Sequence, residues 1–191
     1  MYPKLPELIK YLKTFEATKS IFLVTNGQEP DMIQKLQDED ALPTQLYLST
    51  NAADYESFMK INKPKYDDSW ERWNKTLDML KHLNTRTVLR ITLIKDYNDQ
   101  RESIPAFAEM FRKASPHFIE IKSYMHIGRS TNRLEHKNML EMDEVKNFSE
   151  EISKQSKIFS IMDESIVSRI SILQNNERFI DRFIPSYANT I

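Results

Sequence analysis

The stretch HFIEIKSYMHIGRSTNRL (His117–Leu134) decides the fold, because it combines a strand pattern with charges inside the strand. Side chains alternate between the two faces of a strand, so Ile119 and Ile121 share one face. Glu120 and Lys122 share the other face. A strand buried on both faces is almost uniformly apolar, and charge inside it is costly unless it is paired. This strand therefore indicates either a functional site or a structural ion pair.

The same alternation occurs in TVLRITLI (Thr87–Ile94) and in QLYLS (Gln45–Ser49). Each segment has one aliphatic row and one polar row, and the polar row of the first contains Arg90 and Thr92. Two architectures fit such one-sided strands. In an antiparallel sheet the polar face meets water, whereas in a parallel barrel the aliphatic face meets helices and the polar face lines a lumen.

Amphipathic helical segments, rather than two-residue turns, connect the strand-like segments. The clearest is SWERWNKTLDMLKHL (residues 69–83), where apolar side chains recur at helical spacing. Trp70 and Trp73 belong to that stripe, so we expect them in the core rather than in a cofactor platform. Strands that alternate with helices favour βα units and a parallel sheet. We therefore expect one α/β domain over residues 1–191, built on a parallel sheet.

Composition narrows the possible functions. The chain has no cysteine, which excludes disulfides, thiol catalysis and an iron–sulfur cluster held by its own thiolates. With only two glycines it has neither a GxGxxG motif nor a P-loop, which argues against a flavodoxin-like or nucleotide-hydrolysing protein. Its histidines lack zinc-ligand spacing, so we expect no metal site. No apolar run is long enough for a membrane span, so we expect a cytoplasmic protein without a membrane partner.

Polar residues follow each expected strand, where α/β folds bind their ligands. A group of basic residues also follows the charged strand, around residues 129–137. The net charge of −1 gives no global attraction to nucleic acid. The basic group is thus either a local nucleic-acid surface or a solvated face.

Several segments together resemble one family, the archaeal-type tRNA 4-demethylwyosine synthases, which are radical S-adenosylmethionine (SAM) enzymes of wybutosine biosynthesis. In chain order they are MYPKLPELI, FLVTNG, PTQLYLSTNA, SWERWNKTLDML, RTVLRITLIKDYND, FIEIKSYMHIGRSTNRL, NMLEMDEV and SRISILQN. They cover nearly the whole chain. The resemblance implies a partial (βα) barrel of the radical SAM type, of which this chain is the C-terminal portion.

The resemblance also implies an activity. The family cleaves SAM reductively and condenses pyruvate with N1-methylguanosine in phenylalanine tRNA, forming 4-demethylwyosine. Its CxxxCxxC loop, pyruvate-binding lysine and Gly-Glu-Pro motif are expected upstream of a segment like MYPKLPEL, so the [4Fe–4S] cluster belongs to the full-length family and not to this chain. We expect the isolated chain to be inactive and a separate N-terminal half to be a partner. The alternative is a non-catalytic remnant that binds tRNA or a protein partner.

Site residues carry over where the motifs match. Thr25 and Asn26 match the TNG motif near the methionine end of SAM, and Ser49 matches the serine of an S-x-D-A motif near the SAM ribose. Asn51 stands where the family usually has aspartate, and Thr92 belongs to the RxTLxK strand. The candidate catalytic residues are Arg90, Glu120, Lys122 and His126, and we expect the first three to share one cavity. The candidate tRNA-binding residues are Arg129, Arg133 and Lys137.

Overall fold

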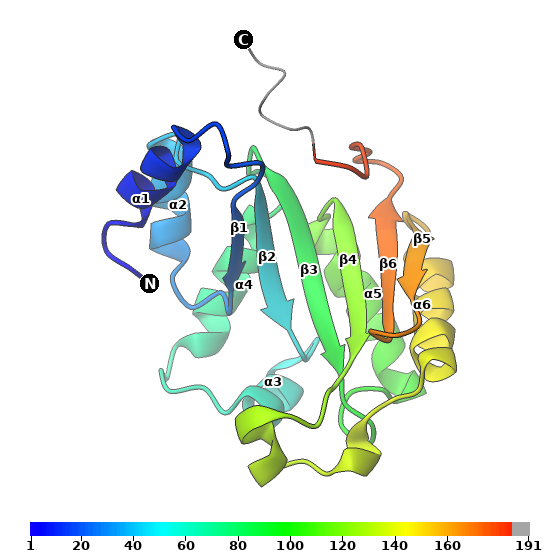
Figure 1. Ribbon diagram of the computed structural model, residues 1–191. Coiled ribbons are helices and arrows are strands. Elements are labelled where there is room, and N and C mark those ends of the chain that lie inside the picture. The colour runs from blue at the N-terminus through cyan, green and yellow to red at the C-terminus, as the bar shows by residue number, and fades with distance from the viewer. Residues whose placement is uncertain (185–191) are drawn as a thin grey trace.

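The computed structural model describes residues 1–184, which form one six-stranded sheet and the helices around it (Figure 1). The strands are β1 (Phe22–Thr25), β2 (Gln45–Thr50), β3 (Arg86–Leu93), β4 (Phe118–Ser123), β5 (Phe159–Ser165) and β6 (Ile170–Asn175). The α-helices are α1 (Leu5–Lys13), α2 (Pro30–Asp38), α3 (Tyr55–Asn62), α4 (Ser69–Met79), α5 (Ile104–Ala114) and α6 (Met142–Ser156). Short 3₁₀ helices are η1 (Arg101–Ser103), η2 (Gly128–Asn132) and η3 (His136–Asn138).

The strand order is β1-β2-β3-β4-β6-β5. β1 to β4 are parallel, whereas β6 runs antiparallel to both β4 and β5. The prediction of an α/β fold is confirmed, and the prediction of an all-parallel sheet is wrong at its last strand. Residues 166–169 alone join β5 to β6, which is too short for the crossover that a parallel pair needs. The partial barrel stays a prediction, because β1 and β5 are the unpaired edges of the described sheet.

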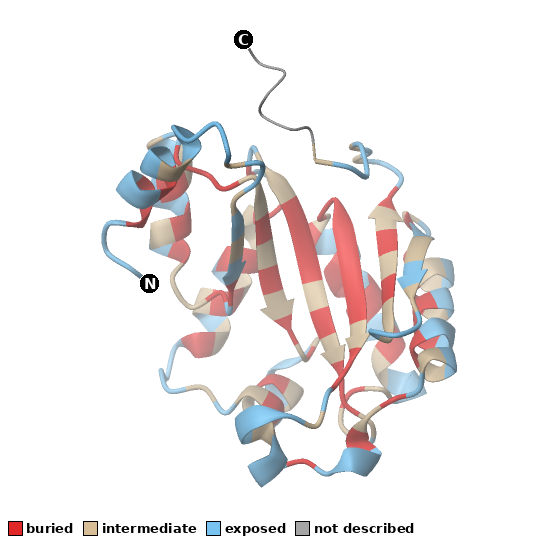
Figure 2. Ribbon diagram, in the orientation of Figure 1, coloured by how far each residue is buried: buried red, intermediate tan, exposed pale blue. Residues whose placement is uncertain are grey.

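One face of the sheet is buried under helices. The aliphatic rows of the central strands lie there, and Leu48, Leu89 and Ile121 are completely inaccessible. Figure 2 shows these buried residues along β2, β3 and β4, with α4, α5 and α6 behind them in Figure 1. Trp73 of α4 is 1% exposed and belongs to this core, as its helical spacing predicted.

No described helix covers the opposite face, which is turned toward the viewer in Figure 1. Strand register places the polar rows side by side on it: Ser49 lies opposite Arg90, and Arg90 lies opposite Glu120. The carboxyl ends of β1 to β4 all point to the same edge, where α3, η2 and η3 lie. Within residues 1–184, no helix has the length and apolar character that crossing a membrane requires.

Candidate functional site

An ion pair occupies the centre of the open face. Arg90 Nε donates to Glu120 Oε1 at 2.7 Å, and a second guanidinium nitrogen lies 3.4 Å from Oε2. The Glu120 side chain is only 9% exposed, and that of Arg90 is 25% exposed. The two side chains meet, as their predicted positions on the polar face of neighbouring strands indicated. They do so on the open face of the sheet, however, and not inside an enclosed barrel lumen.

Tyr47 of β2 completes this cluster. The Arg90 guanidinium carbon lies 4.5 Å from the centre of its ring, within the range of a cation–π contact. Burial, followed by the nearby Glu120 carboxylate, raises the pKa of Tyr47 to about 12. Its hydroxyl therefore stays protonated at neutral pH. The sequence placed Tyr47 on the polar row of its strand but gave no sign of its role, because only the strand register brings it beside Arg90.

The other two candidate catalytic residues lie nearer the carboxyl edge. Lys122 is half-buried on the same face and lies opposite Thr92 in the register of β3 and β4. His126 lies beyond the end of β4, with Nδ1 3.2 Å from the Tyr124 hydroxyl and its ring 6.2 Å from that of His136. Among the described residues, these contacts join His126 to the loop after β4 and not to the central ion pair.

A cavity of about 430 Å³ opens at the carboxyl ends of β1 and β2, under the segment that joins α3 to α4. Three of the five candidate SAM-binding residues line it: Asn26, Ser49 and Asn51. Gln28 and Asn62 add two further amides, and Phe58 and Trp73 form an aromatic wall. We call this space the amide cavity.

Local backbone geometry explains how these residues meet. Gly27 has a φ of +77°, and a Cβ at that position would lie 2.8 Å from Leu48 and 2.9 Å from Trp73. Only glycine avoids both the strained backbone and this contact. The buried Thr25 accepts a hydrogen bond from the Gly27 N–H at 3.1 Å, so it shapes the turn and does not line the cavity. Thr92 is also absent from the cavity wall.

One buried atom of the amide cavity has no partner. Gln28 Nε2 donates to the Ser69 carbonyl at 3.0 Å, but Gln28 Oε1 is buried and accepts no hydrogen bond within residues 1–184. A buried acceptor without a donor costs about 1–3 kcal/mol. The amide and hydroxyl groups of Asn26, Ser49 and Asn51 in the cavity wall fit the hydroxyl and amine groups of SAM.

A second cavity, of about 180 Å³, adjoins the first and shares Asn51 and Lys63 with it. We call it the cationic cavity; its polar wall comprises Lys60, Lys63, Tyr97, Tyr124, Ser130 and Arg133. Arg133 is thus the only candidate tRNA-binding residue in its wall. Arg129 is exposed on η2, and Lys137 forms an ion pair with Glu135 at 3.0 Å.

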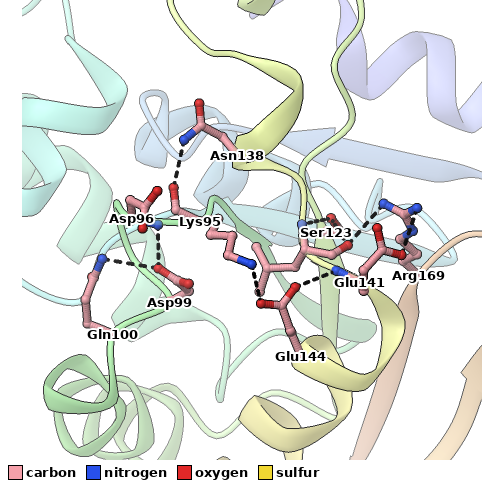
Figure 3. Close-up of polar contacts among 10 residues, drawn as sticks. Lys95, Asp96, Asp99, Gln100, Ser123, Asn138, Glu141, Glu144 and Arg169 are labelled. Atoms are coloured by element: carbon pink, nitrogen blue, oxygen red, sulfur yellow. Dashed lines mark hydrogen bonds and ion pairs between the residues drawn. The ribbon is translucent and has the colours of Figure 1, made fainter.

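The loop from β4 to α6 is tied to the sheet by a polar network (Figure 3). Lys95 and Asn138 exchange two hydrogen bonds through the Lys95 backbone, and the Ser123 hydroxyl bonds both backbone groups of Leu140. The Lys95 ammonium pairs with Glu144, and this hydrogen bond raises the pKa of Lys95. Lys95, part of the RxTLxK match, is therefore held in a structural contact.

A [4Fe–4S] cluster does not fit this chain. The sequence contains no cysteine, and in the described part no three His, Asp or Glu side chains are grouped to hold a metal ion. No chemical step is therefore assigned to a cluster on these residues.

Comparison with known proteins identifies relatives of this chain. The family model described as "Wyosine base formation" matches residues 113–175. A tRNA 4-demethylwyosine synthase of Methanocaldococcus jannaschii, named as S-adenosyl-L-methionine-dependent, is 40% identical over 183 residues. A solved structure of TYW1 with a lysine–pyruvate adduct bound superposes with a TM-score of 0.79 at 39% identity. The chain is homologous to the tRNA 4-demethylwyosine synthases.

The homology covers 95% of this chain but 54% of the M. jannaschii synthase, and 94% of this chain but 54% of the TYW1 structure. The chain thus spans about half the length of these synthases. A wider likeness concerns the fold alone: coproporphyrinogen III oxidase from Escherichia coli, a radical SAM enzyme, superposes with a TM-score of 0.57 at 13% identity. The homology supports the SAM-dependent synthase family that the sequence motifs predicted.

Proposed function

We propose that this chain is the SAM- and tRNA-binding part of a radical SAM enzyme that forms 4-demethylwyosine from N1-methylguanosine and pyruvate in phenylalanine tRNA. One observation carries the proposal. Asn26, Ser49 and Asn51, which match the SAM motifs of the family, line a single cavity at the carboxyl edge of the parallel strands. Ligands of α/β folds bind at that edge.

SAM, when bound and reductively cleaved, supplies the radical that begins the family's reaction. The residues of this chain would hold and orient it. Asn51 Nδ2 donates to Asn62 Oδ1 at 3.0 Å, which leaves the Asn51 Oδ1 atom to accept from a ribose hydroxyl. The Arg90–Glu120 pair and the Lys122 ammonium would face the tRNA base across the open face of the sheet.

The cluster would come from another segment. β1 pairs with β2 on one side only in the described sheet, and Phe22 and Val24 on β1 are 46% and 45% exposed. An exposed strand edge with apolar side chains is suited to pairing with a further strand. We place the cluster-bearing segment against this edge, whether it belongs to the same polypeptide or to another.

SAM binding to the purified chain, measured by titration calorimetry, tests the proposal. We expect Ser49→Ala combined with Asn51→Ala to weaken binding at least fivefold, since two hydrogen-bonding side chains at the cavity wall are lost, each of about 1 kcal/mol. Asn132→Ala, an exposed asparagine on η2, is the matched control and should bind like wild type. A wild-type chain that binds no SAM, or a double variant that binds it unchanged, would contradict the cofactor assignment.

The alternative, a non-catalytic tRNA- or partner-binding remnant, is favoured by the absence of thiolates from the sequence. Mixing the chain with a reconstituted cluster-bearing N-terminal segment of a synthase distinguishes the two. If the chain is part of the synthase, the mixture should form 4-demethylwyosine in tRNA, which mass spectrometry of the nucleosides detects. If the chain is a non-catalytic remnant, it should bind tRNA or a protein partner without forming 4-demethylwyosine.

A further inference from the structure

The cationic cavity gathers three positive side chains from two separate segments. Lys60 and Lys63 come from the end of α3, and Arg133 follows η2. No acidic side chain lines the space, and none of the three cations forms an ion pair among the residues described. By contrast, Lys95 pairs with Glu144 and Lys137 pairs with Glu135 in the same region.

All three cations belong to exposed residues, and each has one contact that helps to place it. Lys63 is the left-handed C-cap of α3, with φ of 46° and its N–H bonded to the Met59 carbonyl. The Lys60 ammonium lies 5.8 Å from the centre of the Tyr97 ring. One guanidinium nitrogen of Arg133 lies 3.4 Å from the Ile61 carbonyl, which anchors the side chain and leaves its other N–H groups free to donate.

Hydroxyl groups and an apolar base complete the cavity. The Tyr124 hydroxyl donates to Ser130 Oγ at 3.1 Å, and Ser130 Oγ donates to the Ile127 carbonyl at 2.6 Å. Below them Ile61, Ile94, Tyr124 and Leu134 form a small buried cluster of their own. The cavity is therefore a formed site with a packed base and polar walls.

The charge of the wall indicates the class of ligand. Lys60, Lys63 and Arg133 line one space that contains no acidic side chain, so an anion is the ligand that this wall favours. An anion that binds among the three cations is attracted by each of them. The Tyr124 and Ser130 hydroxyls already donate within the protein, so the three cations are the donors for an anion. Phosphate offers them more acceptor oxygens than a carboxylate does.

We propose that the cationic cavity binds a phosphate group, and that in the working protein this phosphate belongs to an RNA backbone. The RNA part rests on the proposed function, whereas the phosphate site stands on its own contacts. Asn51 and Lys63 line both cavities, so a nucleotide chain entering the site would place a phosphate beside the cofactor cavity.

Two probes applied to the full chain test this inference. Inorganic phosphate is titrated while the backbone amides of Lys63 and Ser130 are followed by NMR, with acetate at equal ionic strength as the reference. An RNA stem-loop is titrated by fluorescence anisotropy over a range of salt concentrations. We expect phosphate alone to give saturable shifts, and the combined Lys60→Ala and Lys63→Ala variant to lose them.

The same variant should bind the RNA roughly fourfold more weakly at 0.15 M salt. The slope of the logarithm of its binding constant against the logarithm of the salt concentration should be smaller in magnitude by about 1. The control combines Lys19→Ala with Lys157→Ala and should match wild type. Lys157 is an exposed lysine that also caps a helix in the left-handed conformation, so it reproduces both the charge change and the backbone setting of Lys63. Circular dichroism checks that both double variants are folded.

Each outcome decides one part of the inference. Phosphate-induced NMR shifts, together with a weaker salt dependence of RNA binding in the variant, support an RNA phosphate as the ligand. Phosphate shifts with unchanged RNA binding in the Lys60/Lys63 variant would overturn the RNA part and indicate a small phosphorylated ligand. No shifts and unchanged RNA binding would overturn the site, while RNA binding by wild type would leave the proposed function standing. If wild type binds no RNA, the tRNA part of the proposed function fails, and the phosphate titration alone decides the site.

Discussion

The two edges of the sheet are both polar, but their polar groups are used differently. At the amino edge, His117 Nδ1 accepts from the Thr87 N–H at 3.1 Å. Nearby, the fully buried Asn175 donates to the Pro116 carbonyl at 2.9 Å and accepts from the Glu177 N–H at 2.9 Å. At the carboxyl edge, Gln28 Oε1 is buried without a partner in the described chain, and three cations surround one cavity.

This difference separates structural from functional polarity. Groups that satisfy one another within the protein stabilise the fold. A group of cations without acidic partners instead favours the binding of an anion. The Arg90–Glu120 pair lies between the two edges. Two hydrogen bonds join its charged groups to each other, so we assign its main energetic contribution to the fold.

The largest effect is expected from breaking that central pair. Arg90→Ala leaves the mostly buried Glu120 carboxylate uncompensated, so we expect a loss of about 3 kcal/mol in the free energy of unfolding by urea. Arg112→Ala is the matched control, because Arg112 pairs with Glu109 on the exposed surface of α5 and should cost less than about 1 kcal/mol. Equal losses in both variants would place the central pair among ordinary surface ion pairs.

The amino edge makes a pH prediction. Burial, with the positive charges of Arg178 and Arg86, lowers the pKa of His117 to about 4 from its ordinary 6.5. The unfolded chain therefore binds the proton more readily than the folded protein between these values. The stabilisation is complete above pH 6.5 and is lost as the pH falls through about 4.

His117→Asn keeps an acceptor for the Thr87 N–H but cannot titrate in this range. We expect wild type to lose about 2 kcal/mol more stability than this variant between pH 7 and pH 4, measured by urea unfolding at both values. His136→Asn, at an exposed histidine, should retain the wild-type pH dependence. If His117→Asn retains it as well, the imidazole does not govern acid stability.

Much of the fold could be predicted from the sequence. The alternation of apolar and polar residues along β2, β3 and β4 identified the buried and polar rows. The helical spacing of Trp73 assigned it to the core. The antiparallel direction of β6 was missed, because the pattern of a strand does not encode its direction. The short connection at residues 166–169 could have indicated that β5 and β6 are antiparallel.

The site was predictable only in part. Motif matches placed Asn26, Ser49 and Asn51 together, since each follows or ends a parallel strand at one edge. Lys60, Lys63 and Gln28 were missed because they meet the cavities through the path of the α3–α4 segment and the turn after β1. Contacts that form only when separate segments fold together leave no periodic pattern in a single sequence.

The two glycines of the chain test the packing of the carboxyl edge. Both have positive φ, but a Cβ on Gly27 would meet Leu48 and Trp73, whereas a Cβ on Gly128 would meet nothing within 4 Å. Gly128→Ala should cost about 1 kcal/mol from backbone strain alone. Gly27→Ala should cost at least about 1 kcal/mol more through overpacking. Equal thermal unfolding midpoints would show that the wall of the amide cavity adapts without strain.

The smallest effect concerns the cofactor and distinguishes the amide cavity from the satisfied amino edge. Asn51 stands where the family motif usually has aspartate, and its amide nitrogen donates to Asn62 Oδ1. Asn51→Asp loses that donor, but the Asn62 amide can turn and donate to the new carboxylate. A carboxylate accepts a stronger hydrogen bond from a hydroxyl than an amide oxygen does, so we expect SAM affinity to rise about threefold. Asn62→Asp places the same charge on the other side of the pair and is the control. If both variants bind SAM equally, the added charge acts at a distance and Asn51 does not contact the ligand; if Asn51→Asp alone binds more tightly, the motif position itself holds the cofactor.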